Sequence, residues 1–351
     1  MIPHFNKVHN RFKLDGRYFN QSSLKEVAYS YVKEGESYEK SIGDFLLDWL
    51  NSSPFIQVKT SGSTGAPKTI QLQKQAMVHS AIATGDFFKL QPGDSALLCL
   101  PADFIAGKMM LVRAMILGLE IDVTVPTSKP YLLPNKTYKF VAMTPMQLEN
   151  SVDSINAIET LIIGGAKVST RLKEKVKHSK TMLFETYGMT ETITHVAVKP
   201  FNTHYFKTLP SIQISKDKRG CLELIVPYIS KKPIITNDMV AIHSETEFEW
   251  LGRYDNVINS GGVKIHPEQL EAQLSKHLDY NFFFTSITDD QLGDRLVLVL
   301  ETDSNTLDTN TFDDFDKFNT PKDIYCVSKF SYTKSGKIDR AKTLNSIAKL
   351  A

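Results

Sequence analysis

The middle of the chain alternates between short apolar runs and longer segments with apolar residues at helical spacing. The apolar runs predict strands, and they cover residues 55–59, 95–100, 120–125, 138–143, 159–164 and 181–186. Helix candidates lie between several of these strands, at 74–89, 107–118, 145–151 and 169–178. Strands that alternate with helices usually form a parallel sheet covered by those helices. We therefore expect an α/β fold with a mainly parallel sheet.

The pattern changes on either side of this region. Residues 1–50 read as helical and amphipathic, because Ile42, Phe45, Leu46 and Trp49 recur at helical spacing. Between 205 and 250 the pattern becomes one of strands and turns, which predicts a β-rich part of the same large domain.

A domain boundary is predicted within residues 252–256. Beyond it, Pro267 opens a helix candidate at 267–278, and strand candidates follow at 282–288 and 295–301. We expect an N-terminal domain over 1–253 and a small α+β C-terminal domain over 254–351. The polar segment 303–319 shows no clear helix or strand periodicity.

Composition narrows the function classes. The 351 residues are 42% hydrophobic and 23% charged, with a formal net charge of +2, so neither a nucleic acid nor a membrane surface is expected as a partner. Charged residues such as Asp103 and Lys108 interrupt the most apolar region, 96–125, which argues against a membrane span. The first residues have no apolar core typical of a secretion signal. The three cysteines are widely separated, which fits a reducing compartment, and we expect a cytoplasmic protein.

The strongest local signal is a loop of small and hydroxyl residues that follows the first predicted strand. Its glycines allow close approach of the backbone to a ligand, and its hydroxyls, backbone N–H groups and lysine suit phosphate oxygens. A surface turn is the alternative, and Pro67 before the lysine excludes a Walker A loop. The candidate phosphate-binding residues are Thr60, Ser61, Gly62, Ser63, Thr64, Gly65 and Lys68.

This loop resembles the nucleotide-phosphate loop of the adenylate-forming superfamily, which includes acyl-CoA synthetases and adenylation domains. Four further motifs resemble that superfamily in the same order along the chain. They are Tyr187 to Thr192, Thr236 to Asp238 (with Asn237 where the family has glycine), Gly252 to Asn256 followed by Ser260 to Lys264, and Thr333 to Arg340. Because five motifs agree in order, the chain is identified as a member of this superfamily.

The resemblance implies a ligase that uses ATP and Mg²⁺ to activate a carboxylate as an acyl-adenylate and then forms a thioester with coenzyme A. It implies that Glu191 holds the metal and that Thr190 contacts phosphate. Lys337 would bridge the substrate carboxylate and the α-phosphate of ATP, the two anions that come together during adenylation. Taken alone, a glutamate after a strand or a lysine near a C-terminus is usually only solvated.

The resemblance also assigns the nucleotide contacts and a moving part. Asp238 and Arg253 would bind the ribose or phosphate, with Tyr187 and Gly188 beside them, and Gly164, Gly165 and Ala166 would touch the adenylate. Asp255 would be the hinge about which a mobile C-terminal domain rotates, bringing Gly261, Gly262 and Lys264 toward the coenzyme A side. From the residues alone, a tight turn explains Gly164 to Ala166 equally well, a backbone cap is the favoured interpretation of Asp238, and an ordinary turn is the alternative for Asp255.

The substrate is suggested by a narrower resemblance, to the o-succinylbenzoate–CoA ligases of menaquinone biosynthesis. The stretch from Leu100 to Gly107 is similar to theirs, although Phe104 stands where they have histidine, and Arg113 falls at their basic position. The apolar residues around Arg113 predict a buried helix, where a charge needs a partner. We expect Arg113 to bind a second substrate carboxylate, or else a structural acid. His195 is a further pocket candidate, or a satisfied core histidine.

Several alternatives stay open. The acid could be a benzoate or a coumarate, the acceptor could be a carrier protein, and a non-catalytic binding remnant is a third class that Lys337 and Glu191 argue against. The partners expected are a small carboxylic acid, ATP and coenzyme A, and a homo-oligomer is compatible with the sequence. Only about 59 residues precede the phosphate loop. This is fewer than usual in the superfamily, so we expect a trimmed large domain.

Overall fold

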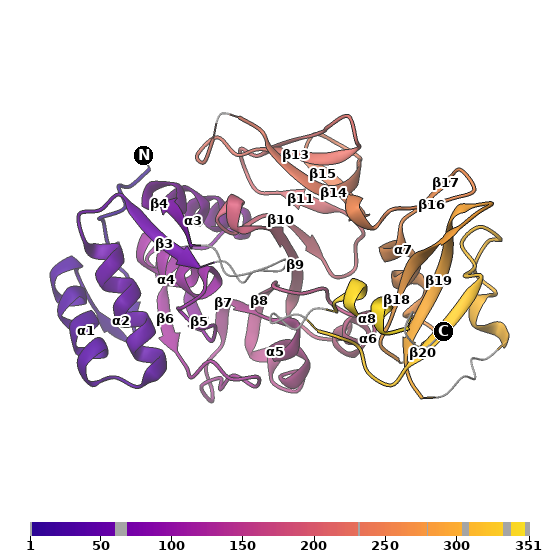
Figure 1. Cartoon of the computed structure of the whole chain (residues 1–351). Coiled ribbons are helices and arrows are strands. Elements are labelled where there is room, and N and C mark those ends of the chain that lie inside the picture. Colours follow the sequence, from indigo (N-terminus) through magenta and orange to yellow (C-terminus); the bar gives the residue numbers. More distant parts are fainter. Residues whose placement is uncertain are drawn as a thin grey trace.

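The fold was analysed in a computed structural model, which describes residues 2–59, 69–230, 232–278, 280–303, 309–332 and 338–347. Its described strands form a 13-stranded sheet, a five-stranded sheet and a two-stranded hairpin of β3 (Phe55–Lys59) and β4 (Thr69–Gln73). In Figure 1 the large sheet occupies the left and centre of the molecule and the five-stranded sheet lies at the right.

The first half of the large sheet is mainly parallel, as the sequence pattern predicts. Strands β6 (Glu120–Val123), β5 (Ser95–Leu98), β7 (Tyr138–Met143), β8 (Ile158–Ile163) and β9 (Met182–Gly188) lie in this order, and each neighbouring pair is parallel. The covering helices are α3 (Lys74–Phe88), α4 (Ile105–Leu117), α5 (Pro145–Asn150) and α6 (Thr170–Val176), with the 3₁₀ turn η1 (Ile155–Ala157) before β8. The predicted α/β fold class is confirmed.

Two hydrophobic clusters lie on opposite faces of this parallel region, because successive side chains of a strand point to opposite sides. In β5, Ala96 and Leu98 pack with α3 and α4, whereas Leu97 packs with α5 and α6. Both faces are buried, which explains why the parallel strands read as continuous apolar runs in the sequence.

The second half of the large sheet is antiparallel. It contains β10 (His195–Pro200), β11 (Phe206–Thr208), β15 (Glu247–Arg253), β14 (Ile234–Ile242), β13 (Cys221–Ile225) and β12 (Gln213–Lys216), in that spatial order. This is the β-rich part that the turn-rich sequence indicates. Strand β10 turns back on β9 through η2 (Thr190–Thr192), so His195 pairs with Gly188 across the hairpin.

The expectation of helix over residues 1–50 is wrong for the first twenty. Residues 13–18 form a short hairpin of β1 (Lys13–Leu14) and β2 (Arg17–Tyr18), and β1 extends the large sheet as a parallel neighbour of β6. Helices α1 (Gln21–Glu34) and α2 (Ser37–Leu50) follow. Two-residue strands leave no periodicity to detect, since only their pairing with β6 defines them.

The five-stranded sheet is antiparallel except at one edge. It pairs β17 (Val263–Ile265), β16 (Ile258–Ser260), β19 (Gly293–Glu301) and β18 (Phe282–Asp289), and β20 (Asp323–Val327) joins β19 in parallel. The helices are α7 (Pro267–Leu274) and α8 (Arg340–Ile347), with 3₁₀ turns η3 (Tyr254–Asn256) and η4 (Thr309–Phe312). The division into domains at residues 253 and 254, and the mobility of the second one, remain predictions.

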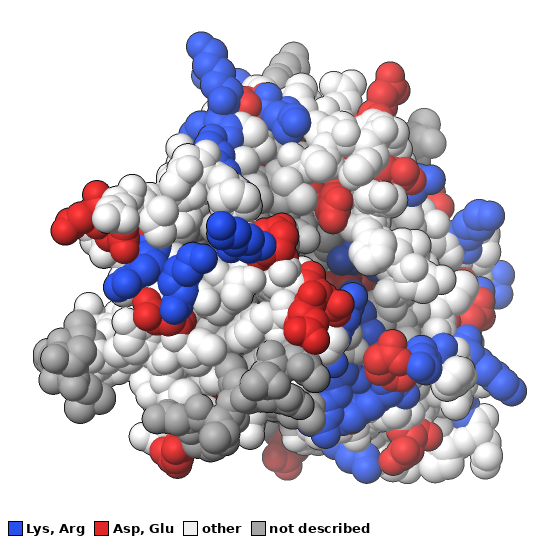
Figure 2. Space-filling model, turned by 90° about the vertical axis from the view of Figure 1, so that its right-hand side faces the viewer, with Lys and Arg blue, Asp and Glu red and all other residues white. Residues whose placement is uncertain are grey.

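The surface that carries the five-stranded sheet has both charge signs. In Figure 2 lysine and arginine side chains are interspersed with aspartate and glutamate over this face. In the described part of the chain, no helix is long and apolar enough to cross a membrane.

Candidate active site

Two of the sequence motifs meet at the carboxyl ends of β8 and β9. These strands are parallel neighbours, and Ile163 is paired with Glu185, so Gly164, Gly165 and Ala166 leave the sheet beside the end of β9. A Cβ atom on Gly164 would lie 2.5 Å from the Thr186 hydroxyl, so a larger residue there would displace this hydroxyl from its hydrogen bond to Ile163 O. Active sites of parallel sheets are commonly built at this edge.

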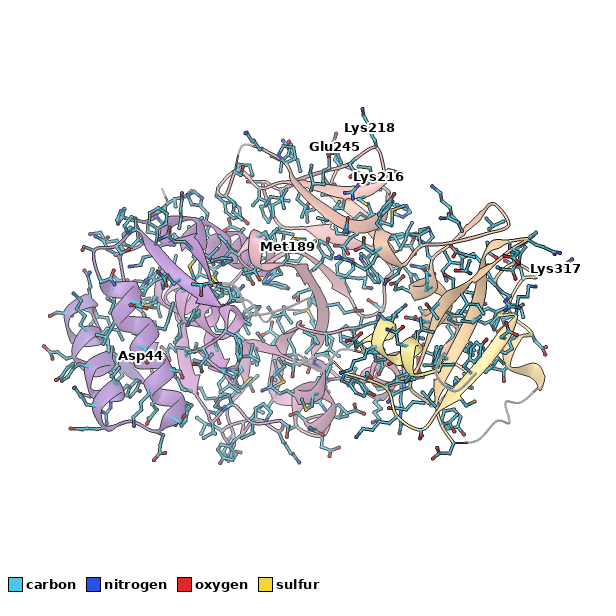
Figure 3. All side chains as sticks on the ribbon, viewed as in Figure 1. Asp44, Met189, Lys216, Lys218, Glu245 and Lys317 are labelled. Atoms are coloured by element: carbon cyan, nitrogen blue, oxygen red, sulfur yellow. The ribbon has the colours of Figure 1, made fainter. Side chains whose placement is uncertain are left out.

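The turn after β9 displays Thr190 and Glu191. The η2 turn is closed by Thr192, whose hydroxyl accepts from Met189 N at 2.9 Å, and Glu191 is exposed. Ile193 has φ +70° and ψ −60°, and Thr194 N donates to Thr192 O at 2.8 Å, which is a strained γ-turn for a β-branched residue. Met189, which is labelled in Figure 3, shows that this turn lies near the centre of the molecule.

Asp238 is held rigidly beside this turn. It is buried on β14, and its two carboxylate oxygens accept from the Tyr187 hydroxyl at 2.6 Å and from Trp250 Nε1 at 3.0 Å. Arg253 NH1 lies 3.6 Å from the same carboxylate. Burial and the neighbouring Asp238 charge both raise the pKa of Tyr187, so its phenol keeps its proton and acts as a donor. The structure therefore brings together Tyr187, Asp238 and Arg253 from motifs that are far apart in the sequence.

Arg113 lies in the interior, as the apolar pattern of α4 predicts. It is 1% exposed. Its Nε and NH2 groups lie 3.4 Å from the Thr84 hydroxyl, the Thr194 hydroxyl and His195 Nδ1, and NH1 lies 3.7 Å from Met110 Sδ. Burial lowers the pKa of Arg113 to about 9, a value at which the guanidinium is still charged at neutral pH. Within the described residues, no carboxylate forms an ion pair with it.

His195 joins Arg113 to the adenylate motifs. The residue starts β10, is 5% exposed, and also contacts the Thr84 hydroxyl through Nε2 at 3.3 Å. Burial, and then the charge of Arg113, hold the pKa of His195 well below its ordinary value. Its side chain is therefore a neutral imidazole. The structure thus places His195 against Arg113, and both side chains are buried.

Side-chain hydrogen bonds join the predicted hinge to the large sheet. Asn237 Nδ2 donates to both carboxylate oxygens of Asp255, at 2.9 and 2.8 Å, and Arg219 NH1 donates to Asn237 Oδ1 at 2.8 Å. Arg253 NH2 lies 3.4 Å from the Asp255 carboxylate. The guanidinium of Arg219 also lies over the Tyr254 ring. Asn237 is the residue that stands where the family motif has glycine. These hydrogen bonds therefore depend on a side chain that the family motif lacks.

The candidate coenzyme A loop is separate from the other site residues. Gly261, Gly262 and Lys264 lie on the β16–β17 hairpin and are all exposed, and Gly261 N donates to Leu292 O at 2.9 Å. In Figure 1 this hairpin points away from the middle of the large sheet. In this arrangement of the two sheets, the loop is not gathered with Asp238 or Arg113.

The two parts of the chain also touch on the other side of the hinge. The Thr170 and Ser275 hydroxyls are 2.7 Å apart, which links α6 to the end of α7. The last described residue of the C-terminal motif, Arg340, forms a 2.8 Å ion pair with the partly buried Glu271 on α7. Burial raises the pKa of Glu271, and Arg340 acts against this rise. Arg340 therefore anchors the end of the motif to α7.

Two groups of predicted site residues lie outside the described residues. These are the phosphate-loop candidates Thr60, Ser61, Gly62, Ser63, Thr64, Gly65 and Lys68, and the catalytic candidate Lys337. The described strands β3 and β4 flank the first group, and their register pairs Lys59 with Thr69. The roles of both groups stay predictions.

The site residues suit a metal that arrives with a nucleotide. In the described part of the chain, no cluster of three or more His, Cys, Asp or Glu residues is arranged to hold a metal ion. Mg²⁺ is usually held by one or two carboxylates together with substrate phosphates, and the exposed Glu191 at the sheet edge fits that requirement.

The sequence reasoning missed Thr84 and Trp250. Thr84 is fully buried on α3 and touches both Arg113 and His195, and Trp250 is one of the two donors to Asp238. A threonine within an apolar helix and a tryptophan in a strand are ordinary in sequence. Only their contacts with Arg113 and Asp238 in the folded chain distinguish them.

The chain is similar to known families and proteins. The profile described as AMP-binding enzyme matches residues 52–216. The 2-succinylbenzoate–CoA ligase of Haemophilus influenzae is 26% identical over 257 residues, which cover 66% of this chain and 55% of that protein. The chain thus spans about half the length of this curated relative.

Solved structures give a longer match. O-succinylbenzoate coenzyme A synthetase (MenE) from Bacillus subtilis, in complex with ATP and magnesium ion, is 18% identical, with a TM-score of 0.69 over 82% of this chain and 69% of that one. It shows the fold. An acyl-CoA synthetase (AMP-forming)/AMP-acid ligase II-like protein from Dyadobacter fermentans is 34% identical, with a TM-score of 0.63 over 92% of this chain and 98% of that one. With this identity along nearly the whole of both chains, and with the profile match, the chain belongs to the family of AMP-binding enzymes.

Proposed function

We propose that this protein is an ATP-dependent, AMP-forming acid–CoA ligase whose substrate is o-succinylbenzoate, in menaquinone biosynthesis. The observation that carries the choice of substrate is Arg113, a buried cation that contacts only neutral groups among the described residues. A dicarboxylic acid has one carboxylate to activate and a second one to meet this charge.

The first half-reaction follows from the groups at the sheet edge. The substrate carboxylate attacks the α-phosphorus of ATP, a phosphoanhydride bond breaks, and pyrophosphate leaves. Mg²⁺ on the phosphates, held by Glu191, and Lys337 would offset the repulsion between the two anions. Asp238 would accept hydrogen bonds from the ribose hydroxyls, because Tyr187 and Trp250 fix the direction of its oxygens. The ATP and magnesium ion bound in the Bacillus subtilis structure support the choice of these two ligands.

In the second half-reaction the acyl group passes from the adenylate to coenzyme A. The thiolate of coenzyme A attacks the acyl carbon, the bond to the phosphate oxygen breaks, and AMP leaves. Gly261, Gly262 and Lys264 are exposed on the β16–β17 hairpin, which points away from the middle of the large sheet in Figure 1. They would therefore reach the acyl group only after rotation of the C-terminal part about Asp255. The cytoplasm is the proposed location, where all these small-molecule partners are present.

The second carboxylate explains why an arginine is found at position 113. Leaving a guanidinium buried without an anion is costly, and a bound carboxylate would remove that cost through paired hydrogen bonds. The named Haemophilus influenzae relative acts on 2-succinylbenzoate, an acid with an aromatic and a succinyl carboxylate. A benzoate or a coumarate has one carboxylate and would leave Arg113 without a partner during activation.

A panel of acids tests the proposal. Each acid is incubated with the full-length protein, ATP and Mg²⁺, and the release of pyrophosphate and AMP is measured with and without coenzyme A. We expect o-succinylbenzoate to have the highest kcat/KM and to yield the thioester. Adenylate formation with no thioester would instead indicate a carrier-protein acceptor. A preference for a monoacid would overturn the choice of substrate.

A further inference from the structure

Arg113 is held by side chains from two other elements. Thr84 comes from α3 and His195 from β10, and these two residues also contact each other at 3.3 Å. The three side chains form a closed triangle, since Arg113 Nε lies 3.4 Å from Thr84 Oγ1 and NH2 lies 3.4 Å from His195 Nδ1. All three are nine-tenths or more buried.

The direction of each hydrogen bond in this triangle is fixed by counting protons. The single hydroxyl proton of Thr84 is donated to the Ser80 carbonyl at 3.0 Å, so Thr84 Oγ1 accepts from both Arg113 and His195. His195 Nε2 therefore carries the ring proton. Its Nδ1 is left with a lone pair and accepts from Arg113 NH2, because a guanidinium only donates.

This arrangement works only with a neutral His195. A second ring proton would point Nδ1–H at Arg113 and place two cations at 3.4 Å. Among the described residues, the charged group in contact with the imidazole is Arg113 on α4, and α3 contributes the Thr84 hydroxyl. Thr194, between η2 and β10, contacts Arg113. Burial and the arginine charge act in the same direction, lowering the pKa of His195.

The nitrogens of the guanidinium differ in the strength of their acceptors. Nε and NH2 have oxygen or nitrogen acceptors, whereas the described contact of NH1 is the Met110 sulfur at 3.7 Å, a weak acceptor. We propose that His195 and Thr84 are positioning residues that fix the plane of Arg113 and so set the preference of the site for a second substrate carboxylate. This inference rests on the proposed function, and it assigns to His195 an action through Arg113 and not through the reacting atoms.

Two pairs of variants test the inference. His195→Leu and Thr84→Val remove the acceptor or the hydroxyl at similar volume. His195→Gln and Thr84→Ser are the matched controls, because glutamine offers a carbonyl to Arg113 and an N–H to Thr84, and serine keeps the hydroxyl. The quantity measured is the ratio of kcat/KM for o-succinylbenzoate to kcat/KM for a monoacid analogue that lacks the aromatic carboxylate.

The expected result is a fall of about tenfold to a hundredfold in this ratio for His195→Leu and Thr84→Val, as for the loss of a hydrogen bond to a charged group. The ratio should stay within about threefold of wild type for the two controls. Arg113→Leu is included as a reference. If Arg113→Leu lowers the ratio and the other two do not, the positioning role is wrong while the proposed function stands. If Arg113→Leu changes both acids equally, the proposed function itself fails.

A spectroscopic measurement does not depend on turnover or on the folding of the leucine variant. The ring nitrogens of the nine histidines are observed in ¹⁵N-labelled protein at pH 7, and the His195 signals are those missing from the His195→Gln spectrum. The triangle requires a protonated Nε2 and an unprotonated Nδ1. An imidazolium, or a proton on Nδ1, would overturn the inference.

Discussion

Arg113 and Arg253 lie in opposite surroundings. Arg113 is 1% exposed in the core of the large sheet and contacts hydroxyls, an imidazole and a thioether. The side chain of Arg253 is 46% exposed at the edge of the hinge, and it lies within 3.6 Å of Asp238 and 3.4 Å of Asp255. The buried cation thus contacts no described anion, whereas the exposed one has two.

The difference indicates which contacts are permanent. An exposed ion pair contributes little free energy and can be exchanged for water or for another partner, which suits a region that must rearrange. Water does not readily replace the contacts of a buried charge, so we expect the surroundings of Arg113 to stay fixed and to bind a ligand of opposite charge. Four variants test this contrast between a movable hinge and a fixed pocket.

The largest effect is expected from Lys337→Ala, which removes the proposed mobile cation. Adenylate formation should fall by about a thousandfold, as when a preorganised transition-state donor is lost. Thioester formation from a supplied acyl-adenylate should be spared. The two half-reactions are measured separately by single-turnover kinetics, with Lys334→Ala as the control in the same motif. An equal loss in both half-reactions would argue against a division of labour between two arrangements.

Arg113→Leu is expected to lower kcat/KM for the diacid by about a hundredfold, because a carboxylate pair in a dry pocket is lost. The monoacid analogue should be affected much less. Steady-state kinetics with both acids and thermal melts provide the measurement. A large drop in Tm, or equal effects on the two acids, would mean that Arg113 is structural and that the pocket is not a ligand site.

His195→Gln should change how stability depends on pH. The folded-state pKa of His195 lies well below its ordinary value, so in mildly acidic solution only the unfolded chain takes up the proton. Wild-type stability should then decrease as pH falls through about 6.5, by roughly 1 kcal/mol per pH unit from this group. The variant lacks that contribution. Urea unfolding of both proteins at pH 7.5 and 5.5 measures it, and identical pH dependences would contradict a neutral buried imidazole.

Asn237→Ala should have the smallest effect, because it removes an exposed contact to the hinge. Loss of the two hydrogen bonds to Asp255 should favour rotation and raise the rate of thioester formation relative to adenylation by about twofold to fivefold. Both single-turnover rates are compared with those of Asn237→Gly, which introduces the residue of the family motif. If neither variant changes the ratio of the two rates, the hydrogen bonds from Asn237 to Asp255 do not restrain the hinge.

Much of the parallel region could be predicted from the sequence. The strands β7 and β8 and the helices α3 and α4 lie close to the predicted positions, because long apolar runs and helical periodicity are local signals. The hairpin of β1 and β2 was missed for the opposite reason, since two-residue strands exist only through pairing with a distant partner. The same applies to β20, which is defined by its register with β19.

The sequence by itself determined the order of the motifs, the α/β class and the burial of Arg113, since these follow from residue types and spacing along the chain. Only the tertiary structure decided what surrounds that arginine. Thr84, Arg113 and His195 come from three elements separated by up to 111 residues, and the proton on His195 Nε2 follows from distances between them. Composition and periodicity carry no information about such distances, because contacts between elements depend on how the sheet and its covering helices pack.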